Sequence, residues 1–463
     1  MKLKGSIKWI IWLVFTLLVA SYLGYRMYDE DKTLFLPGKT SHGHHQIEMA
    51  CAACHTDKFG GKKVLQAACM KCHGEELKLA DDNHPRSKFT DPRNADRIKK
   101  IDALYCVTCH VEHKPELTGV MGVTMPQDFC VNCHYDIAKD RPSHKDLPFT
   151  GCASAGCHNY HDNRALYEDF LLKHLHEKDV LSEKKLLQRN LKLRLQTMPS
   201  YPLKEYPLRS FTRHEQDAPP TLSTDGKLLD EWYQSAHAQS GVNCSACHNI
   251  DIDGKSKKKW LEKPDQKICV NCHKQENEDF LNSMHGMRLA QGLSPMSPAM
   301  SVLKMDNDSK HQQLSCFSCH STHRFDTKYA AINACLNCHA DQHSQAYKHS
   351  LHNKYWRMEQ QGEIKEGNGV SCATCHFPRH EQKQNGKHVI RVMHNQNDNL
   401  RPNEKMIRSV CMNCHGLGFS IDALADRALI DKNFTGLPAK HIKSLDMIER
   451  RVEIQRIKGN KKE

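Results

Sequence analysis

The cysteines and histidines of this chain recur in a fixed pattern, in which two cysteines are separated by two residues and followed at once by a histidine. At Cys130, Cys133 and His134, for example, the sequence reads Asp-Phe-Cys-Val-Asn-Cys-His from residue 128. Two thiols at this spacing can add to the two vinyl groups of a haem, and the adjacent histidine then lies under the iron as its proximal ligand. The pattern therefore predicts covalent attachment of haem c.

The regular pattern occurs ten times. The ten sites are Cys51-Cys54-His55, Cys69-Cys72-His73, Cys106-Cys109-His110, Cys130-Cys133-His134, Cys244-Cys247-His248, Cys269-Cys272-His273, Cys316-Cys319-His320, Cys335-Cys338-His339, Cys372-Cys375-His376 and Cys411-Cys414-His415. An eleventh pair, Cys152 and Cys157 before His158, encloses Ala-Ser-Ala-Gly, whose small side chains allow the extra residues to loop out. The eleven pairs use all 22 cysteines, so we expect eleven haems c.

A single Cys-x-x-Cys pair is also typical of half a zinc knuckle, a thioredoxin-like redox pair or a structural disulfide. None of these requires a histidine directly after the second cysteine. Histidine makes up 32 of the 463 residues, so eleven such coincidences have a probability of about 10⁻¹³. The set as a whole therefore favours haem attachment.

The histidines outside the motifs are candidates for the second axial position on each iron. Eleven of the 32 histidines are proximal, which leaves 21. The candidates are His45 (or His42), His84, His113, His144 and His161 in the first part of the chain, with His174 and His176 in reserve, and His237, His285, His323, His352, His380 and His394 in the second part. Each could instead be a surface or propionate-bonding histidine, and any of the 17 methionines could serve at one or two irons.

The composition is lean for a globular chain, with 39% hydrophobic and 7% aromatic residues. Macrocycles would supply the apolar surface that side chains do not. The formal charge of +12 could indicate nucleic acid or an acidic membrane surface. Eleven haems would add 22 propionates, however, and bring the ferrous protein to about −10. We therefore expect basic side chains to pair with propionates and expect no nucleic-acid partner.

The first 26 residues meet the membrane. Lys2, Lys4 and Lys8 precede an uncharged stretch over residues 9–23, which is short for a span. A cleaved signal peptide ending at Ala20 is the alternative, but Leu18 makes a poor cleavage site. The sequence favours an uncleaved anchor in a bacterial inner membrane, with the bulk of the chain in the periplasm.

Five segments are expected along the chain. They are an N-terminal membrane anchor (1–26), a five-haem domain (27–162), a helical and Pro-rich linker (163–230), a six-haem domain (231–420) and a charged helical C-terminal tail (421–463). Helical leucine spacing runs over residues 164–196. The expected fold class is mainly α-helix and irregular coil wrapped around a covalent haem array, with almost no sheet and a single N-terminal membrane helix.

From residue 51 to residue 415 the chain resembles the multihaem c-type cytochromes, through its motifs and ligand spacing. Low-potential class III cytochromes, which also use the four-residue gap, pentahaem electron donors and hydroxylamine-oxidoreductase-like enzymes are similar. The resemblance implies electron transfer between the quinone pool or a membrane dehydrogenase and a periplasmic or outer-membrane redox partner. No catalytic residue is expected under this hypothesis.

Other functions remain open. One is an oxidoreductase acting on a small nitrogen or sulfur compound at a five-coordinate haem. Nitrite-reductase-type enzymes carry lysine at the proximal position, whereas all eleven sites here carry histidine. No cross-linking tyrosine of the hydroxylamine-oxidising type can be assigned among Tyr329, Tyr347 and Tyr355. The anchor and the first sites also resemble those of quinol dehydrogenases with one N-terminal span, so direct contact with quinol is a further hypothesis. The anchor disfavours an extracellular filament subunit.

Overall fold

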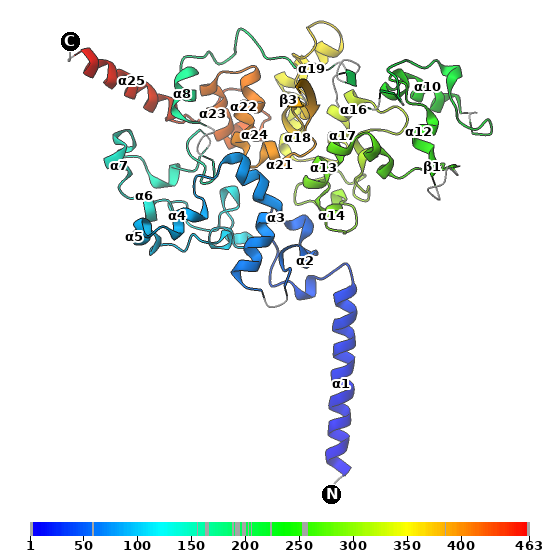
Figure 1. Ribbon diagram of the computed structural model, residues 1–463, viewed down its shortest axis with the longest axis horizontal. Coiled ribbons are helices and arrows are strands. Elements are labelled where there is room, and N and C mark those ends of the chain that lie inside the picture. The colour runs from blue at the N-terminus through cyan, green and yellow to red at the C-terminus, as the bar shows by residue number, and fades with distance from the viewer. Residues whose placement is uncertain are drawn as a thin grey trace. The chain divides into compact units, whose positions relative to one another are not determined.

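The structure of the chain is a computed structural model (Figure 1). It describes residues 3–57, 60–154, 156–162, 166–187, 189, 195–196, 201, 203–204, 206–222, 225–251, 258–384 and 386–460. Within these ranges the chain consists of short helices joined by irregular coil. The predicted fold class is confirmed in this respect, because helix and coil dominate and there is little sheet.

The longest helix is α1 (Leu3–Tyr28), which comes first in the chain (Figure 1). Its stretch Ile7–Tyr28 is 22 residues long, has a mean hydropathy of 1.8 and is not covered by the rest of the protein. At 1.5 Å per residue the stretch measures about 33 Å, which is enough for the hydrocarbon core of a bilayer. By length and composition α1 could be either a membrane span or a signal sequence.

Most other helices are one to three turns long, because the attachment motifs and turn residues interrupt any longer apolar period. Apart from the longer α3 (Lys62–Ala80) and α25 (Ser444–Asn460), the other described helices are α2 (Cys51–Cys54), α4 (Arg86–Thr90), α5 (Ala95–Ile98), α6 (Val131–His134), α7 (Ile137–Asp140), α8 (Glu168–Lys173), α10 (Gly226–Gln234), α11 (Ala236–Gln239), α12 (Cys244–His248), α13 (Lys274–Asn282), α14 (Met287–Ala290), α15 (Cys316–Cys319), α16 (Thr327–Ala331), α17 (Asn333–Leu336), α18 (Gln342–Tyr347), α19 (Leu351–Gln360), α20 (Cys372–His376), α21 (Asn397–Leu400), α22 (Met406–Ser409), α23 (Leu417–Ala425) and α24 (Arg427–Asp431).

The strands of the described residues form two antiparallel hairpins. In the first, β1 (Asn249–Asp251) pairs with β2 (Lys258–Trp260), and in the second, β3 (Arg379–Gln384) pairs with β4 (Lys387–Val392). Each hairpin directly follows an attachment helix, α12 or α20. The hairpins therefore extend individual sites and do not build a common sheet.

The chain divides into two compact units. One comprises residues 1–76, 86–126 and 291–294, and the other comprises residues 77–85, 127–290 and 295–463. The first unit contains α1 and the attachment sites at Cys51, Cys69 and Cys106, and the second contains the other eight sites.

Two small apolar cores lie in the second unit. The larger is formed by buried residues on α8, α22 and α23, namely Leu171, Met406, Ile407, Leu417, Ile421 and Leu424. The smaller is formed by Ala331, Ile332 and Tyr347. Both cores also include attachment cysteines, Cys375 and Cys411 in the larger and Cys372 in the smaller. Protein side chains alone thus bury little apolar surface, as the composition predicted.

Two segments differ from the simplest interpretation of their sequence. In the described part of residues 164–196, α8 ends at Lys173, and residues 180–185 run as extended chain along the last attachment site. There Leu181 N donates to Cys414 O and Lys185 N donates to Asn413 O. The charged helical tail predicted for residues 421–463 begins with buried apolar residues, Ile421 and Leu424, and becomes mostly exposed in the second half of α25.

Candidate haem attachment sites and iron ligands

The regular attachment motif adopts one local conformation. The backbone N–H of the histidine donates to the carbonyl of the first cysteine, four residues earlier, at 2.8–2.9 Å. This bond is present at His55, His110, His134, His273, His320, His339 and His415, outside the longer helices. One helical turn therefore brings both cysteines and the histidine close together, as attachment to one macrocycle requires.

The wider motif closes in the same way. His158 N donates to Cys152 O at 2.9 Å, although six residues separate them instead of four. Gly156 has a φ of +85°, a conformation that glycine adopts without steric cost. The first cysteine and the histidine thus keep the hydrogen bond of the regular sites despite the wider gap.

Polar residues just before the first cysteine begin several attachment helices. The side chain of Asn243 accepts from Cys244 N at 2.9 Å. Ser315 and Ser371 each form a reciprocal capping box with the residue three places on, around α15 and α20. Such caps satisfy amides that lack an intrahelical partner.

Histidine rings face one another across the places where an iron would lie. An iron between two imidazole nitrogens, each about 2 Å away, separates the two ring centres by about 6 Å. Each of nine proximal histidines has a second histidine ring at this separation. The pairs are His44 and His73 (6.0 Å), His84 and His134 (6.2 Å), His144 and His158 (6.1 Å), His237 and His273 (6.1 Å), His248 and His323 (5.9 Å), His285 and His339 (6.3 Å), His320 and His394 (6.4 Å), His343 and His376 (6.1 Å), and His352 and His415 (6.4 Å).

The Nδ1 atoms of many of these rings are held by the protein. A carbonyl oxygen can only accept, so a ring whose Nδ1 contacts one carries its proton there, and the lone pair of its Nε2 is the atom that can bind a metal. Such contacts join His84 to Tyr160 O (2.5 Å), His248 to Leu261 O (2.6 Å), His343 to Ile430 O (2.5 Å), His394 to Val392 O (3.1 Å) and His415 to Asp179 O (3.0 Å). The donor set therefore fits iron ligation through Nε2.

Burial favours the neutral form of five of these histidine rings. Desolvation lowers the pKa of His237, His285 and His352 to about 4, and the same effect acts on the proximal His320 and His376. A ligating imidazole must be unprotonated. The environment of these five rings thus favours the form that can bind iron.

His44 has a carboxylate neighbour. Its Nδ1 lies 2.6 Å from Glu112 Oε1, and Glu112 also accepts from Ser41 N at 2.8 Å. Although burial opposes ionisation, these contacts hold the pKa of Glu112 at about 2. A carboxylate in this position makes its imidazole a stronger donor to iron.

The structure places the predicted axial candidates as follows. His84, His144, His237, His285, His323, His352 and His394 each face a proximal histidine. His113 Nδ1 is 2.8 Å from Gly38 O, and His161 Nδ1 is 3.1 Å from Asp82 Oδ1. The reserve candidate His174 lies 2.6 Å from Glu177 Oε1.

Two facing histidines were not singled out by sequence spacing. His44 faces His73, whereas its neighbour His45 lies with its Nδ1 3.2 Å from His42 O. His343 faces His376, whereas His380 lies in β3 with a buried Nε2. A comparison of the two blocks could have indicated His343. In the first block His144 lies between the fourth and fifth motifs and faces the fifth proximal histidine, and His343 has the same position in the second block.

Cysteines of successive sites lie next to one another. The Cys269 thiol contacts the Cys316 thiol, and the Cys335 thiol contacts the Cys372 thiol, which raises the pKa of Cys269 and of Cys335. At longer range, Cys272 raises the pKa of Cys247, Cys335 raises that of Cys319, and Cys411 raises that of Cys375. In residues 244–414, each site therefore neighbours the next one in the chain.

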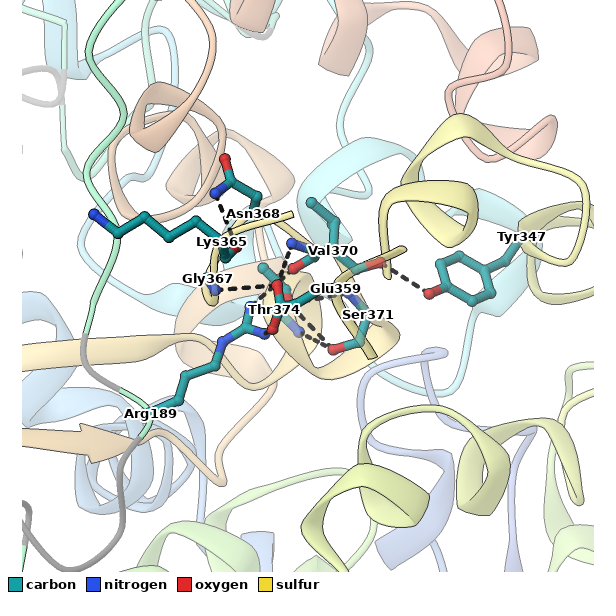
Figure 2. Close-up of polar contacts among 10 residues, drawn as sticks. Arg189, Tyr347, Glu359, Lys365, Gly367, Asn368, Val370, Ser371 and Thr374 are labelled. Carbon is teal, nitrogen blue, oxygen red and sulfur yellow. Dashed lines mark hydrogen bonds and ion pairs between the residues drawn. The ribbon is translucent and has the colours of Figure 1, made fainter. Parts of the chain in front are cut away.

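A polar network orients the site at Cys372 (Figure 2). Arg189 Nη1 lies 2.5 Å from Glu359 Oε1, and Nη2 donates to Gly369 O at 2.8 Å. Glu359 Oε2 also accepts from the amides of Gly367 and Gly369. The residue from the connector between the two blocks thus anchors the loop that leads into α20.

These sites define the class of the protein, since the same attachment turn recurs with paired histidine rings. The chain is a multihaem c-type cytochrome and binds haem c covalently. Residues 43–135 and residues 236–340 each match the family described as cytochrome c3. Each matched region contains four of the attachment motifs. No curated protein and no solved structure matches the chain.

Proposed function

We propose that the chain is a membrane-anchored cytochrome with eleven haems c that conducts electrons between the quinone pool or a membrane dehydrogenase and a periplasmic or outer-membrane redox partner. One observation carries this proposal: nine proximal histidines have a second histidine ring 5.9–6.4 Å away. When bound, haem c supplies one-electron chemistry at its iron. Two imidazoles per iron leave no coordination position for a substrate.

The surrounding residues suit this role. Carbonyl oxygens fix the ring orientation of His84, His343 and His415, so these three rings would hold an iron in a defined orientation. Histidine in both axial positions also favours a lower potential than a methionine ligand would give. Low potentials suit a carrier that accepts electrons from quinol or a dehydrogenase.

The order of the sites supports a linear route. In residues 244–414 the cysteines of each site neighbour those of the following site, from Cys247 to Cys411. The larger apolar core encloses Cys375 and Cys411 together, which places the last two sites side by side. Electrons would therefore pass through this block in chain order, with the site at Cys411 at one end.

The exposed apolar surface of α1 supports a membrane location for the conduit. Its apolar side chains are exposed, with Trp9 70% and Phe15 64% accessible, so a lipid environment would cover them. Lys2, Lys4 and Lys8 favour a cytoplasmic amino terminus and a periplasmic haem-bearing part. The first attachment site begins at Cys51, 23 residues after α1 ends, which suits electron entry near the membrane.

The alternative of an oxidoreductase receives less support from the tyrosines considered for it. Tyr347 is buried, and its hydroxyl donates to Val370 O at 2.8 Å (Figure 2). The Tyr329 hydroxyl accepts from Asn337 Nδ2 at 2.7 Å, and Tyr355 is 46% exposed. Tyr329 and Tyr347 thus have partners that account for their positions.

Inner-membrane vesicles that contain the full chain test the proposal. We expect the protein to stay in the membrane after an alkaline wash, to carry eleven covalent haems by intact mass, and to be reduced by an added quinol with a quinol dehydrogenase present. Release of a shortened chain into the soluble fraction would contradict the anchor. Reduction by dithionite alone, with none by quinol or dehydrogenase, would contradict the proposed place in electron flow.

A further inference from the structure

The two haem-bearing blocks share structural details beyond the motif itself. Gln66 and Gln266 each lie three residues before the first cysteine of the second site in their block. Gln66 Oε1 accepts from Cys106 N at 2.8 Å, and Gln266 Oε1 accepts from Cys316 N at 3.1 Å. The same hydrogen bond thus joins the second and third sites of both blocks.

Thiol contacts repeat in the same order. Cys69 contacts Cys106 as Cys269 contacts Cys316, which joins sites two and three. Cys130 contacts Cys152 as Cys335 contacts Cys372, which joins sites four and five. Five consecutive sites therefore correspond between the blocks, and the site at Cys411 has no counterpart in the first.

The facing histidines also correspond. His44 and His237 each lie seven residues before the first cysteine of their block, and each faces the proximal histidine of the second site. His84 and His285 each lie between sites two and three and face the proximal histidine of site four. His144 and His343 lie between sites four and five and face that of site five.

One further pair of histidines occupies matching positions. His113 and His323 each follow the proximal histidine of the third site by three residues. Both have a left-handed backbone, with φ of 63° and 64°, which is uncommon for a residue other than glycine. His323 faces His248, the proximal histidine of the first site of its block.

We infer that the chain contains two copies of one five-haem unit, and that His113 is the second axial ligand of the first haem, opposite His55. This inference rests on the proposed role of the facing histidines as iron ligands. The haem at Cys411, between His352 and His415, is then an addition to the second copy.

The surroundings of His113 support this assignment. Its Nδ1 donates to Gly38 O at 2.8 Å, which leaves Nε2 for a metal. A side chain at position 38 would collide with the carbonyl of His113, so glycine permits this close approach. The preceding residue, Glu112, accepts from Ser41 Oγ at 2.8 Å and lies 2.6 Å from His44 Nδ1, which places this segment beside the chain that leads into the first site.

The test uses the full-length ferric holo-protein and counts high-spin haem by EPR. His113→Ala is expected to produce one high-spin centre per chain where the parent has none at this haem, and added imidazole should restore the low-spin state. In a Cys51→Ser/Cys54→Ser background, which lacks the first haem, His113→Ala should add no high-spin centre. His323→Ala is the matched control and should also produce one high-spin centre. His45 is the competing candidate ligand, and His45→Ala should leave all haems low-spin.

The outcomes distinguish the assignment of His113 to the first haem from the general proposal that facing histidines bind iron. One high-spin centre from His323→Ala with none from His113→Ala would overturn the assignment and leave the facing histidines as ligands. A high-spin centre from neither variant would refute the proposed ligation itself. A centre that persists without the first haem, or one from His45→Ala, would also overturn the assignment. If His113→Ala yields no holo-protein, His113→Met should instead raise the potential of one centre, and this centre should be absent in the Cys51→Ser/Cys54→Ser background.

Discussion

Arg189 offers a direct test of how the connector between the blocks supports a haem site. The guanidinium is 2.5 Å from the Glu359 carboxylate, and the two side chains are only 14% and 6% exposed. The guanidinium also lies 5.5 Å from the ring centre of Trp356. Arg189→Met would leave the buried Glu359 charge without its partner, and removal of one member of a buried ion pair costs about 3–5 kcal/mol. We expect this cost to appear as easier local opening of residues 362–376.

Hydrogen exchange of the holo-protein, followed by mass spectrometry, measures that opening. Since every 1.4 kcal/mol is tenfold, exchange in this segment should accelerate by about 100-fold or more. Arg209→Met is the matched control, because the ion pair of Arg209 with Glu215 has a similar length of 2.8 Å but is 60% and 34% exposed. An exposed pair contributes at most about 1 kcal/mol. Equal exchange in the two variants would refute the role assigned to Arg189.

Three further predictions follow from individual contacts. His343→Ala should convert one low-spin haem to high-spin, whereas His380→Ala should convert none, and the reverse result in an EPR count would restore His380 as the ligand. His441 lies 2.9 Å from both Asp422 and Asp446, which raise its pKa above the usual value of about 6.5. Its contribution should be complete below pH 6.5 and lost as the pH rises through the raised pKa. The protection of amides at the start of α25, measured against the intrinsic exchange rate at each pH, should therefore fall between pH 6 and pH 8 by the equivalent of under about 1 kcal/mol, and this fall should vanish in His441→Gln. Replacement of Cys372 and Cys375 by serine removes an interior haem, so the haem at Cys411 should drop out of the fast phase of quinol reduction and nine of the ten remaining haems should stay in it. Replacement of Cys411 and Cys414 by serine removes the terminal haem and should leave all ten remaining haems in the fast phase. Identical fast phases in the two variants would contradict the linear order.

The attachment sites could be predicted from sequence because thioether chemistry fixes the spacing of Cys, Cys and His. The fold class followed from the same motifs, since so many short sites leave no room for long helices or sheets. For the wider site at Cys152, haem attachment stays a prediction, and the hydrogen bond from His158 N to Cys152 O is consistent with it.

The second histidine of each pair is less accessible to sequence reasoning, because it reaches its partner through tertiary structure. His44 and His45 are neighbours with nearly the same context, and only the fold decides which one faces His73. His343 lies 33 residues before His376, too far for a local rule to connect them. Leucine spacing over residues 164–196 predicted helix, but residues 180–185 bond instead to the backbone around Cys414. Tertiary hydrogen bonds thus outweigh local propensity there.

The central claim is that two histidines hold the iron at each attachment site. Quantitative EPR of the resting ferric holo-protein, combined with near-infrared charge-transfer spectra, tests this most directly. Low-spin bis-histidine signals should account for the nine irons with facing rings, and for all eleven if His113 and one further histidine complete the set. The account would be contradicted by a high-spin signal, or by a methionine-ligated signal, that amounts to at least one centre per chain at a site with facing rings. His237 with His273 is one such site.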